Sequence, residues 1–190
     1  MHLAGSAAEL ARNLLGDQPE RWRHTVGVAR RAADLADRLR LAQRDRQLLV
    51  AVAWLHDIGY SPAVRDRGFH PLDAARYLDR GRWPGEVGTL VAHHSGARFV
   101  AEVLGLDAGL ACYPFSQSPV TDLLTYADQT IGPDGVPCTV EDRMSGMLRR
   151  HGPGSPNALA HPERGPYLRA VAARVRIRLA HPRPLDPLPA

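Results

Sequence analysis

The chain has 190 residues, of which 44% are hydrophobic, 23% charged and 6% aromatic, and its formal net charge is +4. This length and composition are ordinary for one compact globular domain and exclude two large ones. No stretch approaches the roughly 20 apolar residues of a membrane span, and the N-terminus lacks the basic and apolar segments of a secretion signal. We therefore expect a cytoplasmic protein.

Apolar residues that recur at spacings of three and four predict helices, and no segment alternates as a strand would. The expected helices cover residues 6–15, 19–41, 44–58, 70–81, 84–94, 97–105, 120–130, 140–150 and 164–180. Ser6 is a candidate cap for the first of them. His70 stands directly before Pro71, a pair that suits the first turn of a helix.

These elements predict an all-α fold. Residues 48–55 are eight successive apolar residues, which indicates a central helix buried nearly all round. We expect one domain over residues 1–180, with its core motifs in 20–131 and further helices in 140–180. The last residues, 181–190, are rich in proline and are expected to be disordered.

Five of the nine histidines fall at the ends or inward faces of the predicted helices, beside two aspartates. They are His24, His56, His70, His93 and His94, with Asp57 and Asp128. A single such histidine is more often a core imidazole bonded to a backbone carbonyl than a ligand. As a set, imidazole nitrogens and carboxylate oxygens suit zinc, manganese or iron, and a carboxylate between two cations can bridge them.

The segments that carry these residues are RHTVGVARRAADLA, WLHDIGY, HPLDAARYL, VAHHSG and TYADQTIG, in this order along the chain. The series resembles the HD-domain superfamily of metal-dependent phosphohydrolases over about residues 20–131. The resemblance implies a single helical bundle with the metal site in its centre.

The resemblance also implies a ligand set for about two divalent metal ions per chain, drawn from iron, manganese, cobalt, nickel and zinc. The implied ligands are His24, His56, Asp57 and Asp128, with His70 and His93 completing a second metal site. Asp57 would be the catalytic bridge, and His94 would donate a hydrogen bond or a proton to the substrate. Glu20 resembles an extra ligand of trinuclear relatives, but HHSGARF lacks their Gly-Tyr-Pro motif, so a third metal is not expected.

The sequence departs from many relatives at Tyr60, where a lysine is usual, and at Asp73, where a glycine is usual. All 24 basic residues of the chain are arginine, whose planar guanidinium binds phosphate through two parallel donors. Arg98 and Arg143 are the candidates to bind substrate in place of the lysine.

We therefore expect an enzyme that uses metal-activated water to hydrolyse an ester or anhydride of a small phosphorylated metabolite, with a nucleotide as the first expectation. Two alternatives stay open: a mixed-valent di-iron oxygenase of the same superfamily, and a non-catalytic HD domain that binds a nucleotide. No stable nucleic-acid complex is expected, because the arginines alternate with acidic residues. No membrane partner is expected, and the oligomeric state stays open.

Overall fold

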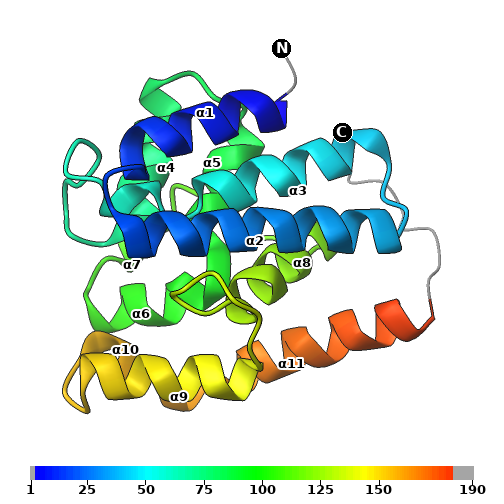
Figure 1. Cartoon of the computed structure of the whole chain (residues 1–190). Helices are drawn as coiled ribbons and strands as arrows, with labels where there is room; N and C mark the ends of the chain where they lie inside the picture. The colour runs from blue at the N-terminus through cyan, green and yellow to red at the C-terminus, as the bar shows by residue number, and fades with distance from the viewer. Residues whose placement is uncertain (1–2, 182–190) are drawn as a thin grey trace.

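The structure is a computed structural model that describes residues 3–181, and it is built almost entirely of helices (Figure 1). The α-helices are α1 (Leu3–Leu15), α2 (Pro19–Arg38), α3 (Gln43–Leu55), α4 (His70–Arg80), α5 (Gly85–His93), α6 (Ala97–Val103), α7 (Asp107–Leu110), α8 (Pro119–Gln129), α9 (Val140–His151), α10 (Pro156–Leu159) and α11 (His161–Ala180). Two 3-10 turns, η1 (Ile58–Tyr60) and η2 (His94–Gly96), lie after α3 and α5. No strand occurs in residues 3–181, so the all-α fold class is confirmed.

The helix starts follow from local chemistry. Proline stands in the first turn of α2, α4 and α8, where its missing N–H leaves no hydrogen bond unmade. The side chains of Ser118 and Thr139 accept hydrogen bonds from backbone N–H groups in the first turns of α8 and α9, at 3.1 and 3.0 Å. These caps fix where α8 and α9 begin.

Some predicted boundaries were wrong for identifiable reasons. Ser6 lies inside α1 and does not cap it, because the helix begins at Leu3. The second helix ends at Arg38 and not near residue 41, because Arg40 has a φ of 51° and leaves the helical path. The short helices α7 and α10 had not been expected. The disordered tail predicted for residues 181–190 lies, except for His181, outside the described residues.

The core is centred on α3, which packs against α1, α2, α5 and α8. The prediction of a buried central helix is confirmed, since residues 48–55 are all buried except Val50 and Trp54, which are partly buried. Figure 1 shows α9, α10 and α11 as a lower layer, separated from α2 by α6 and α8. The C-terminal helices therefore cover one side of the bundle.

A buried ion pair attaches α11 to α8. Asp122 of α8 has a side chain that is 1% exposed, and Arg174 of α11 binds it with two hydrogen bonds of 2.9 and 2.7 Å. Arg178, one turn further along α11, adds a third of 2.8 Å. Planar guanidinium groups suit such two-pronged contacts with a carboxylate.

None of the helices in the described residues combines the length and the apolar character that crossing a bilayer requires.

Candidate metal centre

Five parts of the chain bring histidine and aspartate side chains together beside a cavity of about 510 Å³. The contributing side chains are His24 from α2, His56 and Asp57 directly after α3, His70 from the start of α4, His94 from η2 and Asp128 from α8. They form two adjoining groups of three, within each of which the possible ligand atoms lie within 4.8 Å of one another. Five of the six residues are buried, and His70 is partly exposed.

The first group consists of His24, His56 and Asp128. Asp128 Oδ1 lies 3.0 Å from His24 Nε2 and 3.9 Å from His56 Nε2. Ligands at right angles on one ion, each about 2.1 Å from it, are about 3 Å apart. The spacing of the first group therefore fits a shared divalent metal.

The second group consists of Asp57, His70 and His94. His70 Nε2 lies 3.5 Å from Asp57 Oδ1 and 3.2 Å from His94 Nε2. Two imidazole nitrogens and one carboxylate oxygen are a donor set that zinc, manganese and iron accept. The second group could therefore hold a metal of its own.

Three of these imidazoles have their tautomer fixed by a backbone carbonyl. The Nδ1 atoms of His24, His56 and His94 lie 3.0, 2.8 and 2.6 Å from the carbonyl oxygens of residues 132, 53 and 91. A carbonyl oxygen only accepts, so each Nδ1 carries the proton and each Nε2 keeps a lone pair. His56 Nε2 is buried with no hydrogen-bond partner. Such an orphaned lone pair is costly unless a cation binds it.

Asp57 lies between the two groups. Its Oδ2 is 3.5 Å from His56 Nε2 and 3.9 Å from His24 Nε2, whereas its Oδ1 is on the side of His70. Arg21 of α2 donates a 2.7 Å hydrogen bond to Oδ2, and its guanidinium lies over the ring of Tyr60. One carboxylate thus offers one oxygen to each group.

The ionisation of the site suits metal binding. Burial raises the pKa of Asp57 and of Asp128, but nearby histidine and arginine side chains outweigh it and hold both values far below the usual range. Burial lowers the pKa of His94 to about 4 and that of His70 well below its usual value. At neutral pH the aspartates are therefore charged, while His70 and His94 are neutral with free lone pairs.

Two glycines allow close contacts at the site. A Cβ on Gly59 would lie 2.0 Å from the carbonyl oxygen of His70, so only glycine lets η1 pack against the start of α4. In η2, Ser95 and Gly96 both have positive φ, 52° and 68°. The left-handed conformation is unusual for serine and marks this turn as constrained.

The constrained turn orients Asp128. Ser95 Oγ donates a hydrogen bond to Asp128 Oδ2, and Gln129 Nε2 donates to the same oxygen at 3.0 Å. These contacts leave Oδ1 to face His24 and His56. Ser95 and Gln129 were not identified from the sequence: Ser95 lies 33 residues before Asp128, and the adjacency of Gln129 does not show that its side chain turns back to the carboxylate.

The expectation that His93 completes the second group is corrected by the structure. His93 is the last residue of α5, and its side chain belongs to neither group. Its Nε2 donates to the carbonyl of Tyr113, and its ring lies 5.4 Å from that of Phe115. His94, which we expected to contact the substrate as a proton donor, is instead the second histidine of the second group. Its lowered pKa also makes it a poor acid at neutral pH.

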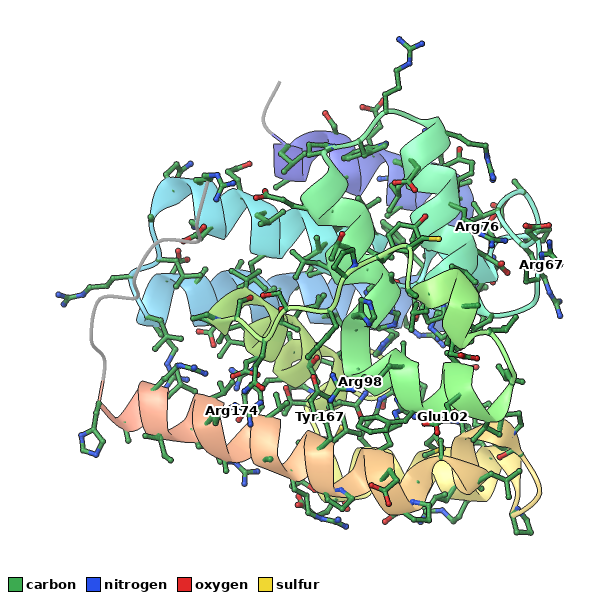
Figure 2. The ribbon with its side chains drawn as sticks, turned by 180° about the vertical axis from the view of Figure 1, so that it is seen from behind. Arg67, Arg76, Arg98, Glu102, Tyr167 and Arg174 are labelled. Atoms are coloured by element: carbon green, nitrogen blue, oxygen red, sulfur yellow. The ribbon has the colours of Figure 1, made fainter. Side chains whose placement is uncertain are left out.

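The arginines expected to bind phosphate have different surroundings. Arg98 does not line the cavity: its guanidinium lies 4.2 to 4.7 Å from the ring centres of Phe99, Phe115 and Tyr167. Figure 2 shows Arg98 and Tyr167 side by side between α6 and α11. Arg143 does line the cavity, with Nη2 at 3.4 Å from Asp128 Oδ1.

Sequence reasoning missed three arginines of the cavity. Arg21, Arg150 and Arg164 all line the cavity. Arg21 could have been suspected from its place three residues before His24, whereas the others come from distant helices. Glu20 also lines the cavity, at its exposed side, and belongs to neither group.

A family model described as the HD domain matches residues 21–130, more than half of the chain. The chain therefore belongs to the HD domain family, whose members bind divalent metals. Both groups of possible ligands lie entirely within the matched residues. Neither the search of curated proteins nor the search of solved structures gave a match.

Proposed function

We propose that this HD domain protein is a metal-dependent phosphohydrolase that holds two divalent metals per chain. The first would be bound by His24, His56 and Asp128, and the second by His70 and His94, with Asp57 between them. The observation that carries the proposal is the set of three imidazoles whose Nδ1 protons are taken by carbonyls, which leaves three Nε2 lone pairs for cations.

Bound metals would lower the pKa of a bound water, and their positive charge would stabilise the reacting phosphate. The chain's own residues prepare the site for them. Asp57 is held in place by Arg21, and Asp128 is held by Ser95 and Gln129, so both carboxylates are already oriented. The neutral state of His94 supports its assignment as a ligand and argues against its assignment as the proton donor.

We propose a small phosphorylated metabolite as the substrate, with a nucleotide as the first candidate. A cavity of about 510 Å³ is within the usual range for small-molecule sites. Arg143 and Arg150 add positive charge to its wall, and Met144, Met147 and Leu168 add apolar surface. Such a cavity suits a ligand with an anionic end and an apolar body.

The test combines elemental analysis of the purified protein with phosphate release from a panel of nucleotides in added manganese. We expect about two metals per chain and release from at least one nucleotide. Asp57→Ala should lose both metal and activity, whereas Asp107→Ala, on the exposed helix α7, should keep both. Two irons with oxygen consumption and no phosphate release would instead identify an oxygenase. Absence of metal would favour the non-catalytic HD domain that binds a nucleotide.

A further inference from the structure

Arg164 of α11 lines the cavity through a guanidinium that is fixed by neutral groups only. Its Nε donates a 2.8 Å hydrogen bond to the carbonyl of Ser95, and its Nη1 donates a 3.1 Å hydrogen bond to Asn157 Oδ1. Its Nη2 makes no hydrogen bond to the described residues. No carboxylate of residues 3–181 lies within ion-pair distance of this guanidinium.

The other arginines of the cavity are in different situations. Arg21 is paired with Asp57 at 2.7 Å, and Arg143 lies 3.4 Å from Asp128. Arg150 is exposed to solvent. Arg164 thus combines a place in the cavity wall, a fixed orientation and a charge that no carboxylate balances in the part of the chain described.

Arg164 is partly buried, so its unbalanced positive charge is partly withdrawn from water, which is unfavourable, and an anion that enters the cavity relieves this. Burial lowers the pKa of Arg164, although arginine stays protonated at any physiological pH. Because two of its three nitrogens are already held, little side-chain entropy is lost when Nη2 binds a ligand. The arrangement suits an oxyanion, which accepts charge-assisted hydrogen bonds.

Ser95 ties this arginine to the metal centre. Its carbonyl accepts from Arg164 Nε, and its hydroxyl donates to Asp128 Oδ2. Gly96, the next residue, allows α11 to come this close, since a Cβ there would lie 3.3 Å from Arg164 Cγ and 3.1 Å from Tyr167 Cδ1. The guanidinium therefore has a defined position beside the first ligand group.

We propose that Arg164 binds a phosphoryl oxygen of the substrate and is a specificity-determining residue of this site. The inference rests on the proposed phosphohydrolase function, because it assigns part of that enzyme's substrate pocket. Arg164 lies outside residues 21–130, the part matched by the family model. Substrate selection would thus be supplied by the C-terminal helices, while the matched domain supplies the metal ligands.

The test measures the affinity of the protein, with the metals it retains on purification, for inorganic phosphate by calorimetry. Arg164→Gln should weaken binding at least about 10-fold, because it removes a charge-assisted hydrogen bond. Arg176→Gln is the matched control, since Arg176 is exposed on the same helix and does not line the cavity. Metal content and melting temperature would be measured for each variant, because a merely structural role would change these instead.

A second measurement needs no variant. Phenylglyoxal modifies arginine side chains, and peptide mapping of the unaltered protein would show whether phosphate protects Arg164 while leaving Arg176 reactive. Protection of Arg164 supports the inference. Equal labelling with and without phosphate, an unchanged affinity in a folded Arg164→Gln protein, or no phosphate binding by the unaltered protein would each overturn it.

The outcomes also separate this inference from the proposed function. If phosphate binds through Arg164 but no nucleotide releases phosphate, the anion site stands and the phosphohydrolase proposal fails. If phosphate is released with unchanged KM in Arg164→Gln, the phosphohydrolase stands and the role of Arg164 is overturned.

Discussion

His93 and His94 are neighbours in the sequence but have opposite surroundings in the structure. His93 is the last residue of α5, and His94 begins the constrained turn η2. The backbone at His94 is extended, with φ −57° and ψ 147°, so the two side chains diverge. Helical spacing could not decide between them, because the helix ends between the two residues.

The divergence leads to a paired prediction. His94→Ala should reduce the metal content from about two to about one per chain and abolish most activity, because it removes one Nε2 lone pair from the second group. His93→Ala should leave the metal content unchanged, because its Nε2 donates to a backbone carbonyl. Elemental analysis of both variants decides between them, and loss of metal in His93→Ala alone would reverse the assignment.

Arg98 is a second residue whose role changes once its surroundings are known. Its guanidinium lies among three aromatic rings, an arrangement that contributes to stability through cation–π attraction. Arg98→Met should lower the free energy of unfolding by about 1–2 kcal/mol. It should leave KM unchanged within about twofold, in contrast with Arg164→Gln. Urea unfolding and steady-state kinetics on the same preparation test both statements, and a raised KM would return Arg98 to the substrate site.

Much of the candidate ligand set could be predicted from the sequence, because His24, His56, Asp57, His70 and Asp128 lie in short motifs at helix ends and faces. Arg164 could not be predicted in this way. It lies 36 residues beyond Asp128 in the sequence and reaches the cavity only because α11 packs beside η2. Its role depends on tertiary packing, which local periodicity does not encode.

At the scale of elements, the position of α11 depends on its contact with α8. Asp122 is buried, whereas Arg174 and Arg178 are 32% and 29% exposed. Solvent reduces the contribution of partly exposed arginines, but the carboxylate still accepts three hydrogen bonds inside the protein. This contact fixes the helix that carries Arg164.

Asp122→Asn should therefore destabilise the protein by about 2 kcal/mol, because it removes the charge from a buried carboxylate with three charged donors. Asp34→Asn is the control: Asp34 pairs with Arg31 at 2.8 Å, but both side chains are exposed or half-exposed. The control should change stability by less than about 0.5 kcal/mol. Chemical denaturation of both variants measures the difference. Equal changes in the free energy of unfolding would show that the α8–α11 ion pair contributes no more to stability than an exposed pair.

Helix boundaries were predicted well where proline or a capping residue fixed them, as at Pro19 and Ser118. They were predicted less well where the chain turns without such a residue. The third helix had been extended to residue 58, but it ends at Leu55 because His56 and Asp57 form a turn toward the cavity. The short helices α7 and α10 have only four residues each, too few to give a periodic pattern.

At the scale of the whole molecule, the proposed metal site lies where α2, α8 and the chain after α3 meet, so metal binding there should stabilise the entire bundle. Metal at about 100 times its Kd would add about 2.7 kcal/mol to the free energy of unfolding. A chelator should therefore lower the melting temperature by about 5–10 °C. Calorimetry before and after chelation measures the shift.

The same experiment on Asp57→Ala serves as the control, since that variant should show no further decrease on chelation. The chelated protein should still fold, because Arg21 and Arg143 offset the charges of Asp57 and Asp128. Complete unfolding on chelation would show that these arginines are insufficient for this purpose.

The division of the cavity between two parts of the chain has a consequence for how such proteins can diverge. The candidate metal ligands come from residues 24–128, whereas α9 and α11 contribute Arg143, Met147, Arg164 and Leu168 to another part of the cavity wall. Substitutions in that wall can change the shape and charge presented to a substrate without altering a single ligand atom. Proteins that share the same metal ligands could in this way differ in substrate preference. An effort to redesign the substrate preference would therefore begin with the C-terminal helices.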